Sequence, residues 1–395
     1  MTALSHLHRT RGMVSGKADS SMQTQRLTIK QNTREHPIWL VRPEDFNCDS
    51  PVDIDPEEIA RNPRFSLYCV DEANRCMVFV ETDNPQAVDD APFYYQAQAE
   101  HAKAVVSMPF ETFHRVANEI APPPKGLIFV HSVGRCGSTL LSKVLAAIPE
   151  VHSLSEPDDI TQLARMRVTG SMPNGDIRDL LASSIRWRGK PRAGSAAEFV
   201  AIKPRAEVMI LADLFETSFP DAKHFFLYRD GLSWMRTLFR NWPEDRDVYD
   251  VELNRKMLKG WSDSLPILKQ FIDQDLPLNP IQIRMYGWIT FMEAYMQMAA
   301  APIETAAACF EDLTTETVPI LAKFFQFCGI DAVDWTQIHE VLGKDSQAGT
   351  IYDREERMKQ NRQLTDALVQ DVLDLVASRP FLLTPNVVLP KTLTP

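Results

Sequence analysis

Apolar and polar positions in the central part of the chain form short apolar runs that alternate with amphipathic stretches. Runs of strand length cover Leu127–Val130, Phe199–Lys203 and Lys223–Tyr228. Apolar residues at helical spacing follow in Ser138–Ile148 and Ala206–Phe219. This alternation predicts an α/β fold with a mostly parallel central sheet, its strands buried on both faces and flanked by helices.

The pattern before residue 123 predicts a small N-terminal α/β extension in residues 35–122. Helical patterns cover Phe93–Ala104 and Phe110–Ile120. Three short runs are expected as strands, the last two as a hairpin: Ile38–Val41, Phe65–Val70 and Cys76–Glu81. The prolines at 122–124 end the second helix and mark the start of the main domain, residues 123–395. The extension carries no recognisable chemistry.

Residues 1–34 are expected to be a disordered leader. The segment Met1–Lys30 is polar and basic, with Asp19 as its single acid. An organelle transit peptide is the second interpretation of this composition.

Charge and cysteine content limit the classes of partner. The net charge of −11 argues against nucleic acid or an anionic membrane surface as the main partner. No window reaches the ~18 apolar residues of a membrane span. The six cysteines show no C-x-x-C pair and no metal-ligand spacing. We therefore expect a reducing, cytoplasmic compartment and no bound metal; whether the chain forms a homo-oligomer is left open.

A glycine-bearing turn joins the first apolar run to its helix. Gly134 and Gly137 let the backbone turn sharply, so that the N–H groups of Arg135 to Thr139 can converge on one anion at the helix N-terminus. Ligands of parallel sheets bind outside the carboxyl ends of the strands. Four charged residues fall at or just past such ends: Arg135, Glu156, Lys203 and Arg229.

The loop lacks the lysine of nucleoside-triphosphate loops, because Ser138 and Thr139 follow Gly137 directly. With Arg135 two residues before that glycine, the loop resembles the donor-phosphate loop of the sulfotransferases. The stretch Lys223–Arg240 resembles the 3′-phosphate motif of that family.

A third stretch, Cys309–Ile330, resembles the late strand of the sulfotransferases, with its E-D-L end and following helix. The resemblance covers roughly Lys125 to Thr350. It implies 3′-phosphoadenosine 5′-phosphosulfate (PAPS) as co-substrate. Within the 3′-phosphate motif, Arg229 and Thr237 correspond to the pair that holds the 3′-phosphate. The donor-binding residues it implies are Arg135, Cys136, Gly137, Ser138, Thr139, Arg229, Thr237 and Ser346.

The resemblance also implies catalytic roles for Arg135, Lys203 and Glu156. Lys203 matches the lysine that touches the sulfuryl bridge. Cytosolic members have K-T-H at this point, whereas this chain has Lys203-Pro204-Arg205 and no histidine. Protein-tyrosine sulfotransferases carry a glutamate 21 residues after the loop cation, which is the offset of Glu156 from Arg135. In the alternative interpretation, Glu156 caps the helix that opens after Pro157.

Two further groups have a structural and a functional interpretation. His131 and His152 lie near the loop and are expected to be packed residues rather than catalysts. Aromatic residues at helical spacing, among them Trp261, Trp288 and Phe291, either fill the core or wall an acceptor pocket.

The predicted function is transfer of a sulfuryl group from PAPS to a hydroxyl or amine, with Glu156 as general base and a small molecule as the expected acceptor. The alternative enzyme is a phosphoryl-transferring kinase, which would need Mg²⁺ and the loop lysine. The alternative from another class is a nucleotide-binding module without catalysis.

Overall fold

The computed structural model of the chain describes residues 23–190, 197–243, 246–331, 333–348, 350, 361–382 and 384–395. Its named strands form two sheets. One is antiparallel and N-terminal, and the other is parallel and follows residue 125 in the chain.

The second sheet has five strands in the order β11-β10-β7-β9-β8, and every neighbouring pair is parallel. The predicted α/β fold with a parallel sheet is confirmed. Its strands are β7 (Gly126–Ser132), β8 (Val151–Ser155), β9 (Phe199–Lys203), β10 (Lys223–Tyr228) and β11 (Thr305–Cys309). β7 lies in the middle, and Ile128, Phe129 and Val130 on it are almost fully buried. The apolar run that predicted β7 therefore marks a strand covered on both faces.

Helices flank the parallel sheet. The helix after β7, α5 (Ser138–Ala146), packs against β7, β8 and β9, and the long helix α12 (Pro280–Ala300) packs against β11. The others are α6 (Asp158–Thr169), α7 (Asn174–Arg188), η2 (Ala206–Leu211), α8 (Ala212–Ser218), α9 (Gly231–Phe239), α10 (Val251–Ser262), η3 (Pro266–Leu268), α11 (Lys269–Asp273), α13 (Phe310–Thr315), α14 (Thr317–Cys328), α15 (Trp335–Leu342) and α17 (Asp366–Ala377). The E-D-L tripeptide was expected at the end of a strand. The strand, β11, ends before it, and the tripeptide lies in the following helix α13.

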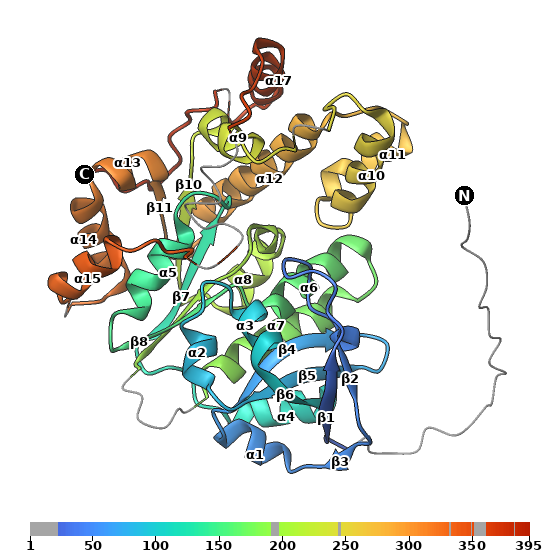
Figure 1. The fold of residues 1–395 in the computed structure, drawn as a ribbon. Coiled ribbons are helices and arrows are strands. Elements are labelled where there is room, and N and C mark those ends of the chain that lie inside the picture. The colour runs from blue at the N-terminus through green and yellow to red at the C-terminus, as the bar shows by residue number, and fades with distance from the viewer. Residues whose placement is uncertain are drawn as a thin grey trace.

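The N-terminal sheet has the strand order β2-β1-β6-β5-β4, with β3 paired to β1. Its strands are β1 (Gln25–Asn32), β2 (Phe46–Cys48), β3 (Val52–Asp53), β4 (Phe65–Asp71), β5 (Cys76–Thr82) and β6 (Ala102–Pro109). Its helical segments are η1 (Pro43–Asp45), α1 (Pro56–Arg61), α2 (Pro85–Asp89), α3 (Tyr94–His101) and α4 (Phe110–Glu119). The predicted hairpin is the antiparallel pair β4 and β5. In Figure 1 these blue and cyan elements lie in the lower half, and β7, β10 and β11 lie above them.

Two predictions for the N-terminal region are wrong. Residues 25–32, placed in a disordered leader spanning 1–34, form β1, because β6 supplies backbone partners and Leu27 and Ile29 pack on a buried cluster. Residues 1–22 lie outside the described residues. The expected strand Ile38–Val41 is a turn and an irregular segment instead. The Ile38 carbonyl and the Val41 N–H bond to side chains of the main domain, not to a neighbouring strand.

The two sheets share one buried core. Phe79 on β5, Phe113 on α4 and Trp187 on α7 are all in contact, with ring centroids 4.8 Å apart for Phe79–Trp187 and 5.7 Å for Phe113–Trp187. The indole N–H of Trp187 donates to the carbonyl of Phe113 at 3.2 Å. The N-terminal sheet is therefore packed into the body of the molecule.

None of the helices in the described part of the chain is long and apolar enough to cross a membrane. All six cysteines are free thiols. Cys69 on β4 and Cys76 on β5 belong to the same hairpin, but they do not lie opposite each other. The register partner of Cys69 is Val78, and that of Cys76 is Asp71.

Candidate active site

The loop after β7 contains three residues with positive φ within four positions. Gly134, Arg135 and Gly137 have φ values of 75°, 54° and 83°. Side chains rarely adopt this left-handed region, so the loop needs glycine at 134 and 137 and stores strain at Arg135. A Cβ on Gly137 would also lie 3.3 Å from the Phe310 ring. α5 begins directly after this turn, at Ser138, so its free N–H groups point into the loop.

Neighbouring groups hold this loop in place. The Gly134 N–H donates to Ser132 Oγ at 3.3 Å, and the Trp234 indole N–H donates to the Gly134 carbonyl at 2.9 Å. Arg229 Nη1 donates to the Arg135 carbonyl at 3.1 Å. The loop shape is therefore set by bonds from β7, β10 and α9.

Arg229 follows β10 and lies beneath the loop. Its Nε donates to Ser233 Oγ at 2.8 Å, and its guanidinium lies 4.4 Å from the Phe310 ring centroid. Glu311 Oε1 lies 3.5 Å from Nε. Burial lowers the pKa of Arg229.

Thr237 lies two turns along α9 from Arg229. Its hydroxyl donates to the Ser233 carbonyl at 3.1 Å, a bond within its own helix. The hydroxyl that contacts Arg229 in this structure is that of Ser233. A shared role of Arg229 and Thr237 on a 3′-phosphate stays a prediction.

Glu156 and Lys203 meet at the ends of two neighbouring parallel strands. Ser155 on β8 is the register partner of Lys203 on β9, and the Glu156 N–H donates to the Lys203 carbonyl at 2.6 Å. The Lys203 ammonium donates to Glu156 Oε1. Lys203 is only 4% exposed, and Glu156 has a φ of 61°. A buried ammonium and a carboxylate on a strained backbone are thus held against one another.

The helix-capping interpretation of Glu156 does not describe this geometry. The N-cap of α6 is Pro157, with no side-chain cap bond, and the Glu156 carboxylate bonds to Lys203 instead. Its second oxygen, Oε2, lies 3.9 Å from Arg205 Nε.

One cavity of about 580 Å³ brings the loop and the two strand ends together. The predicted site residues that line it are Arg135, Ser138, Thr139, Glu156 and Lys203. The other predicted residues do not line it. Cys136 is fully buried, and its thiol faces the Leu227 carbonyl at 3.2 Å. Burial raises the pKa of Cys136 to about 11, so we assign it a packing role.

Gly137 shapes the loop, and Arg229 and Thr237 do not line the cavity. Ser346 lies in a turn beside Gln347, and Gln347 does line the cavity. The chain beside Ser346 therefore approaches the cavity through Gln347, a residue that the sequence did not single out.

The N-terminal extension, which sequence reasoning left without chemistry, contributes three side chains to this cavity: Ile38, Phe93 and Tyr95. No local sequence pattern signals this contribution. The aromatic residues at helical spacing were expected either to fill the core or to wall an acceptor pocket. Trp261 and Phe291 line the cavity, whereas Trp288 is fully buried in the core.

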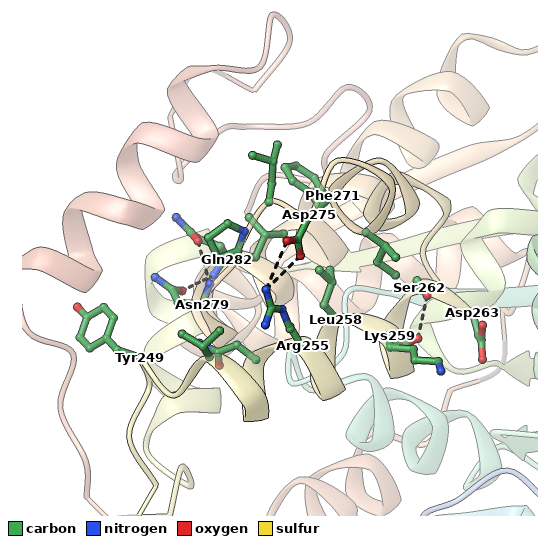
Figure 2. Close-up of a pocket in the computed structure, with 16 residues that line it drawn as sticks. Tyr249, Arg255, Leu258, Lys259, Ser262, Asp263, Phe271, Asp275, Asn279 and Gln282 are labelled. Atoms are coloured by element: carbon green, nitrogen blue, oxygen red, sulfur yellow. Dashed lines mark hydrogen bonds and ion pairs between the residues drawn. The ribbon is translucent and has the colours of Figure 1, made fainter.

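A second cavity of about 680 Å³ lies between α10, α11 and the start of α12 (Figure 2). Figure 2 shows Arg255 paired with Asp275 at its rim, and Asn279 and Gln282 bonded to each other at the start of α12. None of the predicted site residues lines this cavity. We therefore place the candidate active site in the smaller cavity.

His131 and His152 are packed rather than poised for catalysis. His131 Nε2 lies 3.2 Å from His224 Nδ1 inside the sheet. Burial lowers the pKa of His131, and it lowers the pKa of His152 to about 4. Within the described residues, no group of three or more His, Cys, Asp or Glu side chains is arranged to hold a metal ion.

No family model and no curated protein matches the sequence. Solved structures do match, and they include sulfotransferases. The sulfotransferase domain from the curacin biosynthetic pathway is 16% identical, with a TM-score of 0.36, and the match covers 67% of this chain and 95% of that domain. The sulfotransferase from Alicyclobacillus acidocaldarius is 15% identical, with a TM-score of 0.36 and coverage of 66% and 96%. A mouse sulfotransferase complexed with PAP is 13% identical, with a TM-score of 0.36 and coverage of 68% and 88%. Because these identities and TM-scores are low, we take nothing about activity from the likeness and argue function from the site.

Proposed function

We propose that this chain is a sulfotransferase that moves the sulfuryl group of PAPS to a hydroxyl or amine of a small molecule. The observation that carries the proposal is the Glu156–Lys203 pair, which faces the same cavity as the anion-binding loop Arg135–Thr139. A carboxylate that can act as an acid–base group and two cations that can stabilise a leaving phosphate therefore line the same cavity.

The loop fits a donor phosphate. Its positive-φ turn leads into the N-terminus of α5, where backbone N–H groups and the helix dipole favour an anion. Arg135, Ser138 and Thr139 would hold the 5′-phosphate of the donor. Arg229 and Thr237 would hold its 3′-phosphate, with Ser346 closing over the nucleotide.

The donor supplies a sulfuryl group on a phosphate that leaves readily. Lys203 and Arg135 place positive charge where negative charge grows on the departing phosphate. An ammonium has three N–H donors, so Lys203 can bond to Glu156 and to a donor oxygen at once.

Glu156 is proposed as the general base. Lys203 holds its Oε1, and Oε2 takes the proton of the acceptor hydroxyl or amine. Arginine stands in the place where cytosolic sulfotransferases have histidine, and Arg205 cannot accept a proton.

The acceptor is proposed to be small because the cavity of about 580 Å³ has the size and partly aromatic lining of small-molecule sites. Trp242, Trp261 and Phe291 are among the residues that line it. A cytoplasmic location and the oligomeric state stay predictions from the sequence.

The direct test is to incubate the full chain with sulfur-labelled PAPS and pools of small metabolites, and to follow the label into a new product. Label transfer that depends on Glu156 supports the proposal. Phosphoryl transfer from ATP with Mg²⁺ would favour the kinase, and binding of the bisphosphate product without transfer to any pool would favour the non-catalytic module.

A further inference from the structure

Two tripeptides at neighbouring strand ends form matching ion pairs. Glu156-Pro157-Asp158 follows β8, and Lys203-Pro204-Arg205 ends and follows β9. Glu156 pairs with Lys203, and two residues further on Asp158 pairs with Arg205. The second pair lies directly behind the first and has no part in the proposed chemistry.

The Asp158–Arg205 pair is buried and makes two contacts. Asp158 is 0% exposed, Arg205 Nη2 donates to its Oδ2 at 3.0 Å, and Arg205 Nε lies 2.7 Å from its Oδ1. One hydrogen bond from Nη2 and the close approach of Nε therefore hold the guanidinium against the carboxylate.

The N-terminal region holds the other sides of this pair. The Val41 N–H donates to Asp158 Oδ2 at 3.1 Å, and Arg205 Nη1 donates to the Ile38 carbonyl at 3.0 Å. The Tyr95 ring centroid lies 4.1 Å from the Arg205 guanidinium carbon. The Ile38 carbonyl and the Val41 N–H, at the two ends of the segment 38–41, therefore bond to the pair and not to a neighbouring strand.

Glu156 needs such support. Its φ of 61° is unusual for a residue with a side chain, and a following proline favours extended backbone instead. A conformation of this kind persists only where surrounding contacts fix it. Arg205 Nε is 3.9 Å from Glu156 Oε2, the oxygen that Lys203 does not hold.

We propose that Arg205 and Asp158 are positioning residues that hold the Glu156 carboxylate toward the acceptor, and that residues 38–41 and Tyr95 complete this support. The inference rests on the proposed function, in which Glu156 is the base. It makes the N-terminal region part of the active site.

The same fold offers a matched control. Asp159, the next residue on α6, pairs with Arg188, and both are buried. Neither residue lines the cavity. This pair resembles Asp158–Arg205 in burial and chemistry but has no contact with Glu156.

The experiment compares two double variants, Asp158→Asn/Arg205→Met and Asp159→Asn/Arg188→Met. Replacing both partners leaves no buried charge unpaired, which favours folding of both proteins. For each, the affinity for adenosine 3′,5′-bisphosphate and kcat are measured.

The charged or titratable groups that face Glu156 are Lys203, Arg205, Asp158 and Tyr95. The variant Asp158→Asn/Arg205→Met removes the negative charge of Asp158 together with the positive charge of Arg205, so it disturbs the position of Glu156 more than the net charge around it. Its kcat should fall by about 10- to 100-fold, as misplaced catalytic groups do, with bisphosphate affinity unchanged. The control pair should keep both kcat and bisphosphate affinity.

Arg205→Lys separates charge from geometry. It keeps the positive charge but loses the planar fork, so kcat should fall although the charge is retained. Equal kcat in the two double variants would overturn the inference while wild-type transfer still supports the proposed function. A wild-type chain that transfers no sulfuryl group would overturn the proposed function and this inference with it.

Discussion

The Glu156 N–H donates to the Lys203 carbonyl at 2.6 Å, and the Lys203 ammonium returns a bond to the Glu156 carboxylate. Two hydrogen bonds of opposite direction thus join this residue pair, one between backbone groups and one between side chains. Because Lys203 ends β9 and Glu156 directly follows its register partner Ser155 at the end of β8, their relative position follows from the strand register. A base and a cation fixed in this way need little rearrangement before reaction.

Glu156→Gln tests the base. The amide keeps the shape and a hydrogen bond to Lys203 but takes no proton, so kcat should fall by about 10² to 10⁴. Affinity for adenosine 3′,5′-bisphosphate should stay near that of the wild type. If the melting temperature drops while kcat survives within a few-fold, Glu156 has a structural role instead.

Arg229→Ala tests recognition of the 3′-phosphate. Loss of a charge-assisted contact of about 1.5 to 3 kcal/mol should weaken the bisphosphate by roughly ten- to a hundred-fold. Adenosine 5′-phosphate should be bound almost as before. Ser233→Ala is the control, because it removes the hydroxyl that bonds to Arg229 Nε but keeps the guanidinium. Equal losses for both nucleotides in Arg229→Ala would contradict the assignment.

Turnover should survive metal removal. Arg135 and Lys203 supply the positive charge that Mg²⁺ supplies to kinases. We expect excess chelator to leave most of kcat intact. Loss of activity with chelator, restored by Mg²⁺, would point to phosphoryl transfer.

Acid should destabilise the protein through its buried histidines. Burial lowers the pKa of His224 to about 4, below its ordinary value near 6.5. The neutral ring therefore contributes stability that is present above pH 6.5 and is lost as the pH falls toward 4. Between pH 7 and pH 5 this one residue should cost about 2 kcal/mol of unfolding free energy.

His224→Phe provides the comparison, because it keeps a ring against Phe129 but removes the titration. Denaturant unfolding at both pH values should show a smaller acid loss in the variant. The same acid loss in both proteins would show that His224 is not the responsible group.

The parallel sheet and the anion loop could be predicted from local sequence. β9 and β10 have the predicted bounds, because each is a short apolar run between turn residues. The loop was visible because Gly134 and Gly137 are required at positive φ. Glu156 and Lys203 were found as strand-end residues, but their mutual bond depends on the β8–β9 register, which no local pattern reveals.

The N-terminal contribution could not be predicted in the same way. Ile38 and Tyr95 reach Arg205 across more than 100 residues of chain. The bonds of Val41 and Ile38 to Asp158 and Arg205 replace the strand pairing that their apolar pattern indicated. Strand β1 was missed because its alternation is short and lies among polar residues, and β6 supplies the pairing from far along the chain.

The most direct measurement is calorimetric titration of the full chain with adenosine 3′,5′-bisphosphate, adenosine 5′-phosphate and ATP plus Mg²⁺, each with wild type and Arg229→Ala. The site geometry predicts that the bisphosphate binds wild type tightest, needs no metal, and loses this advantage over adenosine 5′-phosphate in the variant. Tighter binding of ATP with Mg²⁺ than of the bisphosphate would contradict a PAPS-dependent sulfotransferase.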